Sequence, residues 1–280
     1  MNSTINIIKA TGEREPYSRE KIIYSIKRAG IPDVLRDQVV RHIEEKLFPG
    51  ISTSEIYRHI SEFIGRSAHP YYEASYNLKR AIMELGPSGF PFEQLVAAIL
   101  SSKGYRDVQT NVTLQGKCVS HEIDVLAVKN EGHYLIECKF HNQPGLRTDV
   151  KVALYVDARF QDVLSAWKAE GDRHKLHQAW IFTNTKCSKD VISYANCRGM
   201  KVTAWGYPDK DNLQELIESG KYYPITCLVS LPNFFKQKLL AQNIVLVSDL
   251  KANKNLIKSL SVSDPEKAKV EQEINYLLNS

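Results

Sequence analysis

Three residues near the middle of the chain, Asp124, Glu137 and Lys139, have the types and the spacing of a metal-dependent hydrolytic site. Two carboxylates on neighbouring strands can hold Mg²⁺ through their oxygen atoms, while waters and a substrate phosphate complete the coordination. A bound ion polarises the phosphate and a water, and a lysine beside it can orient or deprotonate that water. We therefore expect Asp124 and Glu137 to be ligands of Mg²⁺ or Mn²⁺, and Lys139 to activate the attacking water.

Two strands must position these residues. The stretches 119–128 and 133–140 alternate and are rich in branched residues, and 129–132 has the composition of a hairpin turn. Because side chains alternate across a strand, Glu137 and Lys139 share one face of the second strand. The same pattern, taken alone, also fits an ordinary amphipathic hairpin with a surface glutamate and lysine, so its context decides between the two interpretations.

Composition limits the class of protein. The chain has 280 residues, which suggests about two domains, and its net charge of +5 permits contact with nucleic acid without requiring it. Neither an N-terminal apolar leader nor an apolar run near the ~18 residues of a membrane span occurs, so we expect a cytoplasmic protein without membrane contact. The five cysteines form no Cys-x-x-Cys pair, which argues against a disulfide scaffold or a zinc site and favours reduced core residues.

The first 86 residues have the pattern of a short hairpin followed by helices. Strands are expected at 5–9 and 14–17, and Ser18 is a good N-cap for the first helix. A second helix begins at Asp33, and the capping box 52–55 starts a third. A fourth helix is expected from about 71 to 85, before a linker at 86–91 that is rich in glycine and proline.

This segment resembles the ATP-cone, the regulatory nucleotide-binding module of ribonucleotide reductases and of some transcription factors. The resemblance covers about residues 4 to 86 and rests on Ile8-Lys9-x-x-Gly12, on 15–22, on 51–57 and on the basic last helix, although Ala10 stands where the family has arginine. It implies a site for ATP or dATP in which each matched residue has a role. Phosphates would be contacted by Lys9 and Lys21, the backbone would approach the ligand at Gly12, and the nucleoside side would be lined by Thr53 and Tyr57.

A hairpin turn and a helix start both offer N–H groups to an anion, which is consistent with this site. A small helical module that binds a protein partner is the alternative interpretation of the same segment. The short linker would couple this module to the next domain, as regulation requires.

The region after the linker has an α/β pattern. A helix from Phe92 carries Glu93 beside its apolar stripe, and the strand at 107–114 leads into the hairpin that bears Asp124 and Glu137. A long helix is expected at about 147–168. It is followed by a strand at 178–184, a helix at 188–197 and a strand at 200–205, an order that indicates parallel pairing through a crossover helix.

This order resembles the restriction-endonuclease fold, and specifically the Mrr-like branch of the PD-(D/E)-x-K nucleases. The matching motifs between about 88 and 210 are Phe92-Glu93, Gly104-Tyr105, Ile123-Asp124, Glu137-Cys138-Lys139 and Phe182-Thr183-Asn184. The resemblance implies an α/β core, a mixed sheet flanked by helices, with metal-dependent endonuclease activity. It also implies that Glu93 assists catalysis through a metal-bound water. Two histidines, His121 and His141, flank the site.

The last segment, 221–280, is expected to be helical and resembles a degenerate helix-hairpin-helix module without its glycines. Without those glycines a packing or protein-contact role is favoured, and whether the module binds DNA or protein is left open. Its lysines would still attract DNA nonspecifically, namely Lys236, Lys238, Lys251, Lys254 and Lys258.

The sequence therefore predicts three domains: an ATP-cone domain at 1–86, a restriction endonuclease-like domain at 88–220, and a helical C-terminal module at 221–280. The predicted function is a divalent-metal-dependent DNA endonuclease regulated by ATP or dATP. The alternative is a non-catalytic, ATP-responsive DNA-binding regulator built on a decayed nuclease fold. A ribonucleotide reductase fragment is rejected because nothing after residue 90 resembles that enzyme's barrel. The DNA feature recognised, the sign of the ATP effect and pairing into a homodimer or higher oligomer are left open.

Overall fold

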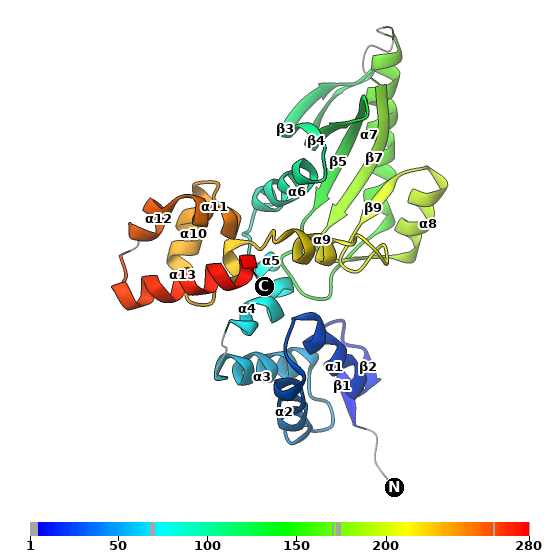
Figure 1. Ribbon diagram of the computed structural model, residues 1–280. Coiled ribbons are helices and arrows are strands. Elements are labelled where there is room, and N and C mark those ends of the chain that lie inside the picture. The colour runs from blue at the N-terminus through cyan, green and yellow to red at the C-terminus, as the bar shows by residue number, and fades with distance from the viewer. Residues whose placement is uncertain (1–4, 68–70, 170, 172–174, 260, 280) are drawn as a thin grey trace.

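A mixed five-stranded sheet lies in the upper part of the molecule in Figure 1, above the N-terminal elements and beside the C-terminal helices. The computed structural model describes residues 5–67, 71–169, 171, 175–259 and 261–279. The sheet has the order β3-β4-β5-β7-β9, with β3 (Arg106–Gln115), β4 (Ser120–Lys129), β5 (Gly132–Lys139), β7 (Lys175–Thr183) and β9 (Lys201–Thr203). The first three strands pair antiparallel, whereas β7 is parallel to both β5 and β9. The predicted mixed sheet flanked by helices is thus confirmed.

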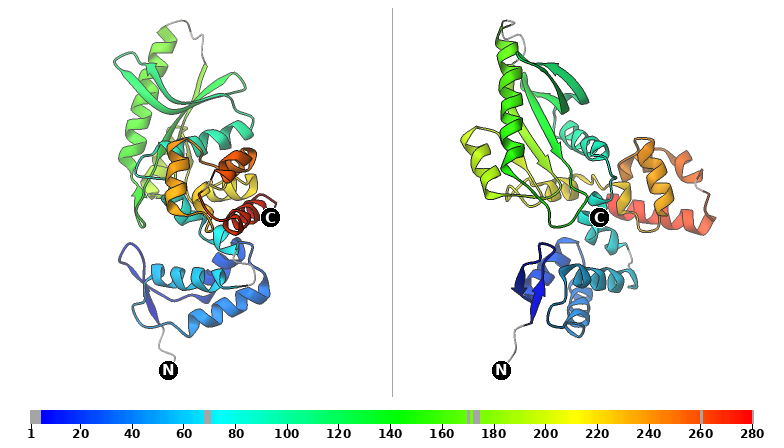
Figure 2. Two further views of the ribbon diagram at one scale, coloured as in Figure 1. Left: turned by 90° about the vertical axis from the view of Figure 1, so that its left-hand side faces the viewer. Right: turned by 180° about the vertical axis from the view of Figure 1, so that it is seen from behind.

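Helices cover both faces of this sheet, as Figure 2 shows. On one face lies α6 (Phe90–Ser102), with α9 (Leu213–Gly220) beside it. On the other face lie the crossover helix α7 (Val150–Ala169) and α8 (Lys189–Cys197). Two short strands, β6 (Arg147–Thr148) and β8 (Lys186–Cys187), form a separate parallel pair. The crossover helix exists because parallel neighbours such as β5 and β7 cannot be joined by a tight turn.

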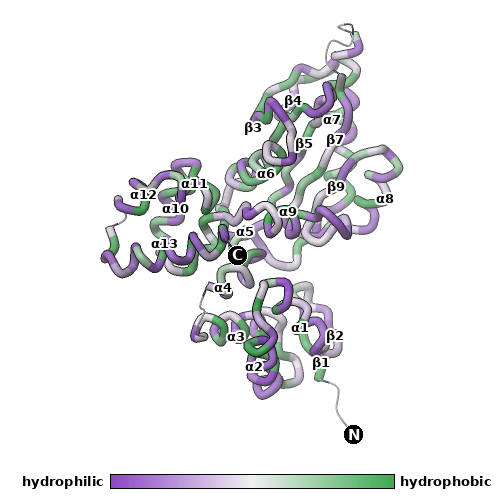
Figure 3. Tube along the Cα trace, viewed as in Figure 1, coloured by the Kyte–Doolittle hydropathy of each residue, from purple (hydrophilic) through white to green (hydrophobic). Residues whose placement is uncertain are grey.

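The N-terminal part consists of a hairpin and three helices with their own apolar core. Its elements are β1 (Asn6–Ile8), β2 (Arg14–Pro16), α1 (Arg19–Arg28), α2 (Asp33–Glu44) and α3 (Thr53–Gly65). The predicted caps are present: Ser18 accepts a hydrogen bond from the backbone of Lys21, and Ser52 and Glu55 form a capping box. Figure 3 shows hydrophobic and hydrophilic residues alternating along these helices, as helices with one buried face require.

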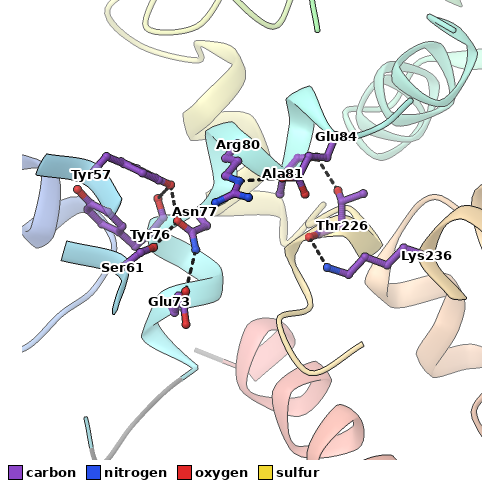
Figure 4. Close-up of polar contacts among 10 residues, drawn as sticks. All are labelled: Tyr57, Ser61, Glu73, Tyr76, Asn77, Arg80, Ala81, Glu84, Thr226 and Lys236. Carbon is purple, nitrogen blue, oxygen red and sulfur yellow. Dashed lines mark hydrogen bonds and ion pairs between the residues drawn. The ribbon is translucent and has the colours of Figure 1, made fainter. Parts of the chain in front are cut away.

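The prediction of one continuous helix over 71–85 is wrong, because the helix is interrupted at Asn77. It forms α4 (Tyr72–Tyr76) and α5 (Leu78–Met83). The side-chain oxygen of Asn77 accepts hydrogen bonds from the hydroxyls of Tyr57, at 2.5 Å, and Ser61, at 2.7 Å (Figure 4). The Tyr57 hydroxyl also lies 3.1 Å from the carbonyl oxygen of Tyr76. Asparagine is a weak helix former, and these contacts favour the local break.

The two halves of the interrupted helix belong to different cores. Tyr76 packs in the N-terminal core, whereas Leu78, Ala81 and Ile82 are buried in the core shared by the sheet and the C-terminal helices. The Thr226 hydroxyl donates to the Ala81 carbonyl at 2.6 Å and adds a polar contact to this packing (Figure 4). The α4–α5 segment therefore joins all three parts of the chain.

The C-terminal part is helical, as predicted. Its elements are η1 (Ile225–Cys227), α10 (Asn233–Ala241), α11 (Val247–Ala252), α12 (Lys254–Lys258) and α13 (Asp264–Asn279). Glu273 is 1% exposed and accepts hydrogen bonds from the backbone of Val229 at 2.7 Å and of Ser230 at 2.9 Å.

Two expectations about side chains need correction. The sequence predicts that Lys236 attracts DNA, but this lysine is only 7% exposed because α10 turns it toward η1, where it donates to the Thr226 carbonyl at 3.3 Å. The side chain of Lys254 lies outside the described residues. All five cysteines are unpaired, yet only Cys138 and Cys227 are core residues; the other three lie at positions where helices and turns leave them partly or fully exposed. No helix among the described residues has the length and apolar character needed to span a bilayer.

Replacing Asn77 by alanine should lower the free energy of unfolding by about 1–3 kcal/mol, because two partly buried hydroxyls lose an acceptor. Chemical denaturation of the full chain without nucleotide measures this loss. A double-mutant cycle combines this variant with Tyr57→Phe. The losses of stability in the two single variants should sum to more than the loss in the double variant, because each single substitution removes the same hydrogen bond. Strictly additive losses would contradict the assigned contact.

Candidate functional site

Asp124 and Glu137 are neighbours across the β4–β5 pair. Val125 pairs with Ile136 in the antiparallel register. Asp124, directly before Val125, therefore lies opposite Glu137, directly after Ile136. The carboxylate of Asp124 is half-buried and accepts a hydrogen bond at 2.7 Å from the backbone N–H of Cys138. The structure therefore brings together the two residues that the sequence predicts as metal ligands.

Glu137 is held by two side chains of α7. Arg159 donates to its carboxylate at 2.7 Å, and the hydroxyl of Tyr155 donates to its second oxygen. Arg159 also donates to the carbonyl of Glu122 at 2.9 Å. Neither Arg159 nor Tyr155 is among the site residues predicted from the sequence. Their i, i+4 spacing puts both on one helix face, which is the signal that could have identified them.

A third carboxylate, Glu93, stands in the first turn of α6 beside the other two. Burial raises the pKa of Glu93 to about 7, and the charges of Asp124, Glu122 and Glu137 act in the same direction. Burial likewise raises the pKa of Asp124 to about 6, with the charge of Glu137 as the next cause. Three carboxylates are thus crowded into one partly desolvated place, where negative charge is costly.

This donor set suits a hard divalent cation, since it offers only carboxylate oxygens. In the part of the chain that the structure describes, no group of three His, Cys, Asp or Glu side chains is arranged so that it could hold a metal ion. Two carboxylates, those of Asp124 and Glu137, would then be the ligands from the protein, and water would complete the coordination. The ion would compete with Arg159 for Glu137.

Lys139 ends β5, where it pairs with Thr183 of β7 and is half-buried. His141, two positions after the end of β5, is held through its backbone. Its N–H donates to the side-chain oxygen of Asn184 at 2.9 Å, and the side-chain amide of Asn184 donates to its carbonyl at 2.7 Å. The His141 ring lies 3.2 Å from the Thr148 hydroxyl. Burial, and next the charge of Lys139, lower the pKa of His141. His141 thus anchors the chain directly after β5.

His121 has a structural role. Its ring nitrogen lies 2.8 Å from Asp162 of α7. Asp162 also accepts a hydrogen bond from the backbone of Cys118 at 2.9 Å, so this pair ties the β3–β4 turn to the helix.

The predicted phosphate contacts converge in the N-terminal part. Both Lys9 and Lys21 reach the same carboxylate oxygen of Glu15, at 3.0 and 2.9 Å. Gly12 has φ +83° in the turn that follows Lys9, and its N–H donates to the Lys9 carbonyl at 2.9 Å. Because Ile8 pairs with Ser52, Thr53 at the start of α3 lies beside this hairpin.

Tyr57 lies elsewhere on α3. Its ring stacks on Tyr76 with the centroids 4.9 Å apart, and it borders a cavity of about 310 Å³. Ser25 and Arg28 of α1 border the same cavity, and they follow Lys21 by four and seven positions. That spacing places all three on one face of α1, although Lys21 itself does not line the cavity.

The hairpin turn touches the loop that leaves the candidate active site. A side-chain carbon placed on Gly145 would lie 3.0 Å from the backbone oxygen of Ala10, and Gly145 has φ +85°. The loop after Lys139 and the turn between Lys9 and Gly12 are therefore packed backbone to backbone.

Without divalent ions, stability should fall as pH rises from about 4 to 7. The unfolded chain releases the protons of Glu93 and Asp124 near the ordinary pKa values of these groups, 4.5 and 3.8, whereas the folded chain holds them until about 7 and 6. Unfolding in this interval releases protons, so the free energy of unfolding decreases with pH. In scanning calorimetry with EDTA, the free energy of unfolding of Glu93→Gln should decrease less with pH than that of wild type. Glu131→Gln, in the exposed turn, is the control and should show the same decrease as wild type. Equal pH slopes for wild type and Glu93→Gln would refute the crowding.

Comparison with known proteins identifies three successive segments. Family models match the chain as an ATP cone domain over residues 5–83, a nuclease-related domain over 88–183 and an AF1548-like C-terminal domain over 223–278. An uncharacterized protein of Archaeoglobus fulgidus is 46% identical over 133 residues, which cover 48% of this chain and 71% of that protein.

One solved structure agrees with the family match. The crystal structure of the protein of unknown function AF1548 is 35% identical, with a TM-score of 0.55, and the match covers 69% of this chain and 100% of that chain. Can2 from Sulfobacillus thermosulfidooxidans, solved with cyclic tetra-adenylate, is 13% identical with a TM-score of 0.33 over 69% of this chain and 60% of its own, a likeness too weak to support any inference. The chain belongs to the AF1548-like family, in which it carries an ATP-cone domain followed by a nuclease-related domain.

Proposed function

We propose that this protein is a divalent-metal-dependent DNA endonuclease whose activity responds to ATP or dATP bound by its N-terminal domain. The observation that supports this function best is the crowding of Asp124, Glu137 and Glu93 in a segment matched by a nuclease-related domain, with Lys139 two residues after Glu137 on the same strand. A protein keeps carboxylates in such a place at a cost in stability, and perturbed carboxylates of this kind are typical of functional sites.

Each residue of the site has a proposed task. Asp124 and Glu137 would hold Mg²⁺ or Mn²⁺, which when bound polarises the scissile phosphate and a water. Lys139 orients the attacking water or takes its proton, and Glu93, whose pKa of about 7 is close to neutrality, exchanges a proton with a neighbouring water. Arg159, once Glu137 turns to the cation, is left to neutralise a phosphate of the DNA.

One observation favours the alternative of a non-catalytic DNA-binding regulator. Glu137 already has an ion pair with Arg159 and a hydrogen bond from Tyr155, which satisfy its charge without a metal. A decayed site would be expected to have lost some of its chemical groups, whereas Asp124, Glu137, Lys139 and Glu93 are all present. The complete set supports the enzyme.

Supercoiled plasmid should be cut in the presence of Mg²⁺ or Mn²⁺, and Lys139→Ala should lower the cleavage rate by about 100-fold or more, the usual cost of losing acid–base help. A gel assay measures the rates, with and without ATP or dATP. Lys189→Ala, an exposed lysine of α8, is the matched control and should cut like wild type. Absence of metal-dependent cutting in every condition would refute the enzyme, and full activity of Lys139→Ala would refute the site.

The nucleotide proposal is supported by the convergence of Lys9 and Lys21 on Glu15. A carboxylate between two lysines occupies the position that a phosphate would take. The cavity of about 310 Å³ beside Tyr57 is lined by Ser25 and Arg28 of the same helix as Lys21, and it offers room for a nucleoside. A phosphate would therefore displace Glu15 from the two lysines.

Calorimetric titration of the full chain with ATP should give measurable binding, and Lys21→Ala should weaken it about tenfold, the effect of one charge-assisted hydrogen bond. Glu15→Gln should instead tighten binding, because the lysines lose their internal counter-charge. Lys27→Ala, on another face of α1, serves as the control and should bind like wild type. Binding by wild type that Lys9→Ala and Lys21→Ala leave unchanged would contradict the assigned phosphate site.

A further inference from the structure

The cavity beside Tyr57 is formed by two domains. Its N-terminal wall includes Arg28 of α1, Tyr57 of α3 and Lys79 of α5, and its opposite wall comes from residues that follow the nuclease-related segment 88–183 and belong to the part of the chain that packs on the sheet. That wall consists of Trp205, which follows β9, and of Gln214 and Glu218 on α9. Any ligand that fills the cavity is therefore in contact with both domains.

Lys79 supplies an uncompensated positive charge to this cavity. Its ammonium lies 5.6 Å from the centroid of the Trp205 ring, within the range of a cation–π contact. Among the described residues, no carboxylate lies within ion-pair distance of Lys79, and the neighbouring charge is that of Lys186, another cation. Burial, and next this like charge, lower the pKa of Lys79. The Lys79 ammonium thus has no anionic partner among the described residues, and the Trp205 ring lies beside it.

Arg28 and Glu218 form an ion pair across the same cavity. Their charged groups are 3.5 Å apart, and the two side chains are 24% and 26% exposed. Gln214 donates to the Glu218 carboxylate at 2.7 Å and keeps it facing the partner domain. This pair joins the N-terminal domain to α9, and its arginine is the kind of group that binds phosphate well.

We propose that this cavity is part of the nucleotide site and that bound nucleotide contacts the nuclease domain there. This proposal rests on nucleotide binding by the N-terminal domain. The Lys79 ammonium, positioned by Trp205, contacts a phosphate of ATP, and the ring of Tyr57 borders the base. Arg28 pairs either with Glu218 or with the phosphates. Nucleotide binding therefore breaks the Arg28–Glu218 ion pair and changes how α9 is held, because one arginine cannot serve both anions equally.

Because Glu218 and the phosphates compete for Arg28, removal of the Glu218 charge should increase the affinity for ATP. Glu218→Gln removes the competing carboxylate but keeps the shape of the side chain, so ATP should bind about three- to tenfold more tightly to this variant. General damage to the fold cannot produce tighter binding. Lys79→Met should weaken binding about tenfold, because it removes the cation and keeps most of the apolar stem. Calorimetry on the full chain gives both dissociation constants.

Tryptophan fluorescence provides a second readout. The chain has three tryptophans, and in the variant Trp167→Phe/Trp180→Phe only Trp205 remains. ATP should change the emission of this variant. In Trp205→Phe, whose remaining tryptophans lie away from the cavity, the ATP-dependent change should vanish although calorimetry still detects binding.

The outcomes separate the two proposals. Suppose that wild type binds ATP, that Glu218→Gln and Lys79→Met bind it with unchanged affinity, and that ATP does not change the fluorescence of Trp205. This result would overturn the proposal of the shared cavity but would not contradict the proposed contacts of Lys9 and Lys21. Absence of ATP binding by wild type would overturn nucleotide binding itself, and the shared cavity with it. Tighter binding by Glu218→Gln together with an ATP-dependent Trp205 signal supports the proposal.

Discussion

The hydrogen bonds at Asn77 are the interaction on which the arrangement of the three parts depends. They interrupt the helix that leaves the N-terminal domain, so that α4 stays in one core while α5 enters the other. Thr226 then bonds to Ala81, which adds a contact from the C-terminal part to the same short segment (Figure 4). A continuous helix would carry its apolar stripe in one direction only. The break allows two differently oriented faces to be buried.

Charge balance links the candidate sites. Each of them pairs a predicted ligand-binding group with an internal counter-charge: Glu15 with Lys9 and Lys21, Arg159 with Glu137, and Glu218 with Arg28. Partly buried charges are costly when they are unpaired, so such pairs stabilise the protein without ligand. A ligand of the same sign as the internal partner replaces it with little penalty. On the proposed function, binding would exchange partners rather than create new charges in the site.

Much of the site follows from local patterns. Alternation along β4 and β5 is enough to put Asp124 and Glu137 on adjacent strands, and the capping boxes and turns mark the helix starts correctly. The helix break at Asn77 could not be predicted in this way, because the hydroxyls that cause it come from α3. The prediction for Lys236 is wrong for the same reason. Its burial depends on how α10 packs on η1, and no pattern within the helix reveals that contact.

The sequence by itself determined the elements, their order and the residues with suitable chemistry, because periodicity, caps and turns act over a few residues. Only the tertiary structure decided which of these residues meet. Arg159 and Tyr155 reach Glu137 from α7, Gly145 packs on the Ala10 turn, and Glu218 pairs with Arg28 across the domain boundary. The cavity beside Tyr57 likewise exists only where two domains come together. Such contacts depend on packing between segments far apart in the chain, and local propensity carries no information about them.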